Sequence, residues 1–230
     1  MECQYPQTRY KFVIFDFDGT LANSLEWLNR VMPAAAARFG FRIISHENHA
    51  FLRTLDAGEL IDYLQISKWK LPLLASYLRR RMTKEIRETT LYYGVEYMIQ
   101  HLFSVSIRLA ILSSNSKTNV QRVFGSHRSN MFDYYQCNSP YLGKTTRLKK
   151  LLNKSGYRAY ETLFVGDEIR DLEAAREAGI AFGAVTWGFN NQTAFEKYQP
   201  EVIFHEVSDI ARMFTHQNSF IHTDSDFPQK

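Results

Sequence analysis

The chain has 230 residues, of which 45% are hydrophobic and 23% are charged. These are ordinary values for a globular protein large enough to bury a sizeable core, so they exclude a fibrous or wholly disordered chain. The formal net charge of +4 favours an anionic substrate, but nucleic-acid binding is not expected, because the dense basic run Arg79-Arg80-Arg81 lies on a predicted helix face without a groove-reading motif.

The first predicted element is a strand over residues 12–17, rich in β-branched and aromatic residues and therefore buried on both faces. Asp16 and Asp18 appear where it ends, two residues apart, so their carboxylates point to the same side and repel unless a cation or proton intervenes. A divalent metal ion is the simplest resolution, with Gly19 allowing a sharp turn and Thr20 offering a hydroxyl and an N–H to phosphate oxygens. The alternative is that the acids only cap the next helix.

A long helical region follows. A helix capped by Asn23 or Ser24 is expected to end before Gly40, and Pro33 is expected to kink or restart it. From residue 47 to about 91 the apolar spacing stays helical and no convincing strand interrupts it. An all-helical block between two strands of an α/β pattern predicts an inserted domain.

Polar clusters recur where the next strands end. The strand 107–112 runs into Ser114 and Asn115, at a position where open parallel sheets bind ligands, although a plain cap for the following helix is the alternative. Lys144 follows a glycine at the start of an amphipathic helix, where a lysine is most often solvent-facing. A short strand is expected near residues 134–137 between these two clusters.

A third buried strand, 162–165, ends in Gly-Asp-x-x-x-Asp. Asp171 could simply cap the helix 172–178, but Asp167 has no such explanation. Two further strands are expected at residues 181–186 and 202–204, with a loop between them and a closing helix at 207–214.

Taken in order, four motifs resemble those of the haloacid dehalogenase-like hydrolase superfamily: Asp-Phe-Asp-Gly-Thr-Leu from Asp16, the Ser114 cluster, Lys144, and the acids of 166–171. The resemblance extends from residue 12 to about 214 and looks closest to the phosphoglycolate phosphatase-like branch. It implies an α/β fold, with a Rossmann-like parallel-sheet core in residues 1–22 and 92–215 and a helical cap domain in 23–91.

In that family the first acid, here Asp16, attacks phosphorus, and the second, Asp18, is general acid and then general base. The resemblance assigns Mg²⁺ to Asp16, the backbone carbonyl of Asp18 and Asp167, with Asp171 near a bound water. The phosphate-binding groups that it implies are Gly19, Thr20, Ser114, Asn115 and Lys144.

The expected function is Mg²⁺-dependent hydrolysis of a small phosphorylated metabolite through an aspartyl-phosphate. A β-phosphoglucomutase-like phosphotransferase and a catalytically silent binding protein of the same fold are the alternatives. A dehalogenase fits less well, because that branch does not keep the acid at Asp18.

Substrate choice is expected to fall to the cap, because the core motifs are committed to metal, phosphoryl group and proton transfer. Arg53 lies between apolar neighbours in Phe51-Leu52-Arg53-Thr54-Leu55-Asp56. It is interpreted either as the ligand of a substrate carboxylate or as an ordinary surface arginine.

The remaining features concern location and partners. Cys3 and Cys137 match no metal spacing, the polar N-terminus does not resemble a signal peptide, and no apolar run approaches a membrane span. We therefore expect a cytoplasmic protein with free thiols and no membrane contact, and a disordered tail at residues 216–230. The sequence favours no particular oligomeric state.

Overall fold

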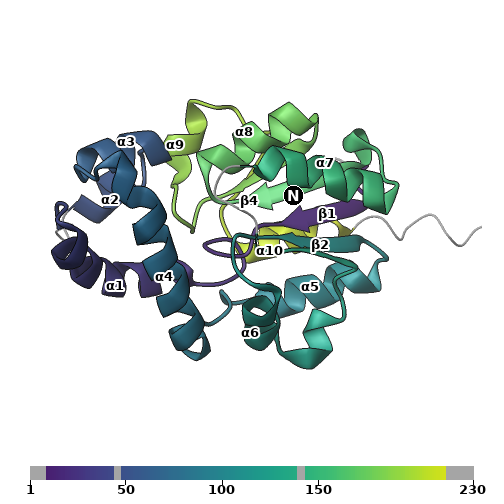
Figure 1. Cartoon of the computed structure of the whole chain (residues 1–230). Coiled ribbons are helices and arrows are strands. Elements are labelled where there is room, and N and C mark those ends of the chain that lie inside the picture. Colours follow the sequence, from purple (N-terminus) through teal and green to yellow (C-terminus); the bar gives the residue numbers. More distant parts are fainter. Residues whose placement is uncertain (1–8, 44–47, 139–142, 216–230) are drawn as a thin grey trace, which may run out of the picture.

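The computed structural model describes residues 9–43, 48–138 and 143–215, so that Cys3 and the predicted tail lie outside the described residues. In the described part, six parallel strands form one sheet in the order β3-β2-β1-β4-β5-β6 (Figure 1). The strands are β1 (Phe12–Phe15), β2 (Arg108–Leu112), β3 (Tyr134–Gln136), β4 (Thr162–Gly166), β5 (Ala181–Val185) and β6 (Val202–Phe204). The first strand is central, with Phe15 opposite both Ile111 of β2 and Val165 of β4.

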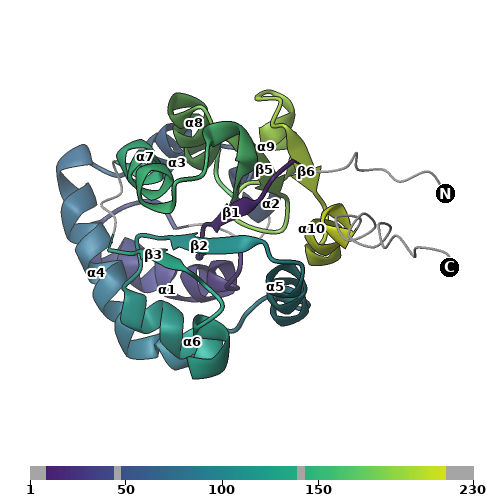
Figure 2. The same cartoon turned by 90° about the vertical axis from the view of Figure 1, so that its right-hand side faces the viewer.

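Helices cover both faces of the sheet, as the α/β pattern predicts. Side chains alternate along β1, so Val13 and Phe15 pack into one apolar core and Phe12 and Ile14 into the other. Figures 1 and 2 show the two helical layers on opposite sides of the strands. The first core is closed by α5 (Val95–Ser104), α6 (Lys117–Ser129) and α10 (Val207–Met213), and the second by α7 (Lys144–Ser155), α8 (Ile169–Ala178) and α9 (Gln192–Glu196).

The segment between β1 and α5 is helical, as predicted, and its helices lie together to the left of the sheet in Figure 1. Trp27 and Met82 belong to one small apolar cluster there, and Leu64 and Leu74 belong to a second. These clusters are distinct from the two sheet cores, with Val123 of α6 packing against both the Trp27 cluster and the first core. The division of the chain into core and cap domains stays a prediction. The helices are α1 (Ser24–Phe39), α2 (His49–Leu52), α3 (Ala57–Tyr63) and α4 (Leu71–Glu85).

Two expectations about the helices are wrong, one on the continuity of the first helix and one on the start of α8. The first helix ends at Gly40, which takes the left-handed conformation, and it passes through Pro33 as one helix. The α8 helix begins at Ile169, so Asp171 lies inside its first turn and is not its N-cap, a position that Glu168 takes. The α9 helix was not predicted. No helix in the described part of the chain combines the length and apolar character needed to cross a bilayer.

Candidate active site

Three adjacent strands end in polar residues at the same edge of the sheet. Asp16, Ser113 and Asp167 directly follow β1, β2 and β4. Parallel strands bring their carboxyl ends together, so these side chains converge. Asp16 is only 3% exposed, and its Oδ1 accepts a hydrogen bond from the Phe17 N–H at 2.7 Å.

Carboxylates from two strand ends and one helix form a buried cluster. Among the described residues, Asp16, Asp167 and Asp171 each place an oxygen within 4.8 Å of the others. The Lys144 ammonium, from the first turn of α7, lies 2.5 Å from Asp16 Oδ2 and also pairs with Asp171. Burial by itself lowers the pKa of Lys144, but the charges of Asp16 and Asp171 outweigh it and raise the pKa above its ordinary value. One fixed positive charge therefore faces three carboxylates.

The remaining charge imbalance fits a divalent cation. Asp171 Oδ2 is buried and has no hydrogen-bond partner among the described residues. Burial raises the pKa of Asp167 well above its ordinary value, with the charges of Glu168, Asp16 and Asp171 acting in the same direction. Burial likewise raises the pKa of Asp171, to about 6. Several anionic oxygens converging in one place are the donors that a hard divalent cation requires, so Asp16, Asp167 and Asp171 could hold one.

We predict that the metal-free protein loses stability as the pH rises. A carboxyl group with a raised folded-state pKa stabilises the fold fully below its unfolded pKa of 3.8, and this contribution is lost as the pH rises through about 6 for Asp171. For this group alone the loss is on the order of 3 kcal/mol. Most of this loss falls between pH 3.8 and 5.5, and about 1 kcal/mol of it remains above pH 5.5. Thermal melts in chelator should therefore show a melting temperature roughly 2–4 °C lower at about pH 7.5 than at about pH 5.5.

Added Mg²⁺ should remove most of that difference, because it replaces the protons as the neutralising charge. The Asp171→Asn variant should show a flatter pH dependence in chelator. A melting temperature in chelator that is unchanged or higher at the upper pH would contradict the repulsion that we assign to the buried carboxylates of this cluster.

The Asp18 carboxylate is not part of the cluster of three acids. It accepts hydrogen bonds from the Asn115 amide at 3.3 Å and from the Ser113 hydroxyl at 3.4 Å. Burial raises its pKa, although these donors and Lys144 act in the opposite direction. Asp18 also lines a cavity of about 420 Å³ between the sheet and the helices α1, α3 and α4. The two acids of the first motif therefore have separate environments.

Two glycines allow the main chain to approach Asp167 closely. A Cβ on Gly19, where φ is +79°, would lie 2.1 Å from Asp167 Oδ2, and one on Gly188 would lie 2.3 Å from Asp167 Cβ. The Phe189 N–H donates to Oδ2 at 2.8 Å, and the Thr20 hydroxyl donates to Oδ1 at 2.7 Å. The Thr20 hydroxyl therefore donates to Asp167 and not to a phosphate. Of the two Thr20 groups that were predicted to bind phosphate, only the main-chain N–H is left for that role.

Arg53 lies at a junction between the helical segment and the loop after β5. Its guanidinium donates to the Thr186 carbonyl at 2.6 Å and to the Gly188 carbonyl at 3.0 Å. In return the Asn190 amide donates to the carbonyls of Arg53 and Leu55. These contacts engage Nε and Nη2 of the guanidinium that was predicted to bind a substrate carboxylate, and that role stays a prediction.

The structure thus brings most of the predicted residues to one place. Asp16, Lys144, Asp167 and Asp171 meet in the cluster, while Asp18, Ser114 and Asn115 border the cavity with Arg53. Three residues that the sequence analysis did not assign to the site also lie there: Ser113, Gly188 and Asn190. The run Trp-Gly-Phe-Asn directly after a strand was the available signal for the last two, by the same strand-end rule that singled out the other motifs.

Comparison with known proteins gives consistent matches. The family model described as haloacid dehalogenase-like hydrolase matches residues 13–185. A phosphoglycolate phosphatase of Synechococcus elongatus is 32% identical over 204 residues, which cover 88% of this chain and 96% of that protein.

Solved structures share the fold. The crystal structure of a putative phosphoglycolate phosphatase from Lactobacillus plantarum superposes with a TM-score of 0.74 at 22% identity, covering 89% of this chain and 99% of that one. CbbY from Rhodobacter sphaeroides, solved in complex with phosphate, gives a TM-score of 0.65 at 19% identity over 87% of this chain and 96% of its own.

Proposed function

Because the chain belongs to the haloacid dehalogenase-like hydrolase family, we propose that it is a phosphatase that hydrolyses a small phosphorylated metabolite through a covalent aspartyl-phosphate. The observation that carries the proposal is the separation of two carboxylates at the end of β1. Asp16 is fixed beside an ammonium, whereas Asp18 faces a cavity and has a raised pKa.

Asp16 is the nucleophile. Its Oδ1 is oriented by the Phe17 N–H and its Oδ2 by Lys144. One carboxylate oxygen attacks phosphorus while the ester P–O bond breaks, which gives the aspartyl-phosphate and an alcohol. Lys144 holds the carboxylate in place and balances the charge of the incoming phosphoryl group.

Asp18 moves the proton. Burial raises the pKa of Asp18, which favours the protonated carboxyl group that can protonate the leaving oxygen. As a carboxylate it then removes a proton from the water that attacks the aspartyl-phosphate, which restores Asp16 and releases inorganic phosphate. Asn115 and Ser113 hold Asp18 toward the cavity during both steps.

Asp16, Asp167, the carbonyl of Asp18 and, through water, Asp171 are proposed to hold Mg²⁺. The ion would neutralise the phosphoryl oxygens and the clustered acids. Residues 23–91 are proposed to act as a cap over this site, since hydrogen bonds from Arg53 and Asn190 join the two parts.

A screen of phosphorylated metabolites, including 2-phosphoglycolate, with purified protein and Mg²⁺ tests the proposal through release of inorganic phosphate. Release with only water as acceptor indicates a phosphatase, whereas interconversion of sugar phosphates without net release indicates the mutase alternative. Phosphate release from no member of the panel would contradict the proposed function.

We predict that phosphate release requires Mg²⁺. Without it, the acids of the cluster repel each other and the incoming phosphate. Excess chelator should stop the reaction, and Ca²⁺ should restore roughly a tenth of the rate or less, because its larger and looser coordination misplaces Asp16. Full activity in excess chelator would contradict the metal assignment.

A further inference from the structure

The cavity beside Asp18 is large for a two-carbon substrate. Its volume of about 420 Å³ falls in the range of roughly 300–1,000 Å³ that is typical of sites for drug-sized ligands. At about 30 Å³ for each water molecule, it would hold on the order of 14 waters. Asp18, Ser114 and Asn115 line one part of the cavity, so a phosphoryl group placed beside them leaves most of this space for the alcohol part of the ester.

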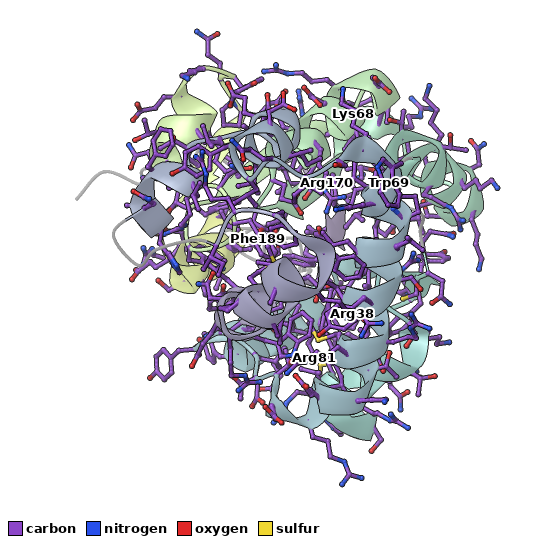
Figure 3. The ribbon with its side chains drawn as sticks, turned by 60° about the vertical axis from the view of Figure 1, so that its left-hand side comes forward. Arg38, Lys68, Trp69, Arg81, Arg170 and Phe189 are labelled. Atoms are coloured by element: carbon purple, nitrogen blue, oxygen red, sulfur yellow. The ribbon has the colours of Figure 1, made fainter. Side chains whose placement is uncertain are left out.

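The wall opposite Asp18 is mainly apolar. Helices α1, α3 and α4 contribute Trp27, Leu28, Leu60, Leu78 and Met82. Phe189, which is labelled in Figure 3, adds an aromatic ring from the loop after β5. Trp27 and Met82 belong to the same apolar cluster, which fixes their positions. Such a wall binds apolar surface favourably, at about 25 cal/mol for each Å² removed from water.

The arginines in the described lining already donate some of their N–H groups to other residues. Arg53 donates to two main-chain carbonyls, and Arg170 donates two N–H groups to the Glu168 carboxylate. The Arg79 Nε donates to the Ala75 carbonyl one turn earlier in α4. A substrate carboxylate placed against the apolar wall would lose its water and would have to share guanidinium groups that are already partly engaged, which disfavours it relative to an apolar group.

We propose that the substrate of this chain is a phosphoric monoester with a bulky, predominantly apolar alcohol part, larger than the glycolate of 2-phosphoglycolate. This inference rests on the proposed phosphatase function and extends it to the substrate class. The phosphoryl group lies at Asp16 and Asp18, and the apolar body lies against Trp27, Leu28 and Leu60.

The test uses n-alkyl phosphates, whose leaving alcohols have nearly equal basicity, so that chain length alone varies. From ethyl to hexyl phosphate, kcat/KM should rise by up to about fourfold for each methylene, as expected for transfer into an apolar site. Hexyl phosphate should exceed 2-phosphoglycolate by about tenfold or more. Calorimetric binding of hexylphosphonate and ethylphosphonate, which are not hydrolysed, gives a readout independent of turnover.

A cavity-filling variant and a matched control locate the effect. Ala75→Leu, on the α4 wall, should lower the hexyl-to-ethyl ratio of kcat/KM by about tenfold or more, because leucine occupies space that the longer chain needs. Ala37→Leu makes the same change at an exposed position of α1 and should leave the ratio unchanged. The ratio is insensitive to loss of folded protein, which circular dichroism monitors separately.

The outcomes separate the two proposals. If alkyl phosphates are hydrolysed without a rise with chain length, or 2-phosphoglycolate is the better substrate, the apolar-substrate inference is overturned and the phosphatase function stands. If no ester is hydrolysed while hexylphosphonate binds more tightly than ethylphosphonate, the phosphatase function is overturned and the apolar site stands. Equal binding of the two phosphonates overturns the inference directly.

Discussion

Replacing Asp16 by asparagine should lower kcat by on the order of 10⁴-fold or more, the scale expected when a catalytic nucleophile is removed. An amide is a poor nucleophile toward phosphorus and a weaker ligand for a hard cation. The fold should persist, because the asparagine Oδ1 can still accept from the Phe17 N–H and Lys144 keeps its contact with Asp171. Phosphate release and circular dichroism of the purified variant measure the two effects separately.

A matched control is available on α3. Asp62 is exposed, so Asp62→Asn removes the same charge from the surface and should leave kcat within about twofold of the unchanged protein. If Asp16→Asn keeps more than a few per cent of the activity while Asp62→Asn keeps all of it, Asp16 is not the nucleophile. Trapping a phosphorylated Asp16 in the unchanged protein would give direct support.

The strand-end acids were predictable because their chemistry is local. Asp16 and Asp167 each follow a run of buried strand residues. Burying a charge there costs free energy unless the charge is paired, so the acids stand out as functional candidates in the sequence itself. The parallel direction of the strands follows from the alternation of strands and helices, whereas their order in the sheet was not predicted. These features depend on residues that are neighbours in the chain and on the side-chain periodicities of strands and helices.

The contacts that the sequence did not predict are long-range and involve the main chain. Arg53 donates to main-chain carbonyls of residues more than a hundred positions away. Every residue has a main-chain carbonyl, so the sequence does not indicate which ones accept these hydrogen bonds. The Thr20 hydroxyl was expected to face phosphate but bonds Asp167, because the Gly19 and Gly188 backbones bring the two together. Asn190 and the unpredicted α9 belong to the same closely packed region.

Lys144→Met should affect both activity and stability strongly. In the folded protein Lys144 is 6% exposed and contacts two buried carboxylates, so its removal leaves those charges without a counter-ion. Breaking a buried pair by removing one partner costs about 3–5 kcal/mol. We therefore expect a decrease of that order in the free energy of unfolding in chelator near neutral pH, and a fall of roughly 10²–10³-fold in kcat/KM from lost charge stabilisation.

The pH dependence and a neighbouring lysine separate this effect from a simple packing defect. At about pH 5.5 the Lys144→Met variant should recover part of its stability, since Asp171 can take up a proton in place of the lost ammonium. Mg²⁺ should restore stability at neutral pH in the same way, but not the activity, because the ammonium that holds Asp16 is gone.

Lys149→Met, which changes an exposed lysine of the same helix, should alter neither property. Urea denaturation with and without chelator measures the difference. Equal stability of the two variants in chelator would mean that Lys144 does not neutralise the buried acids.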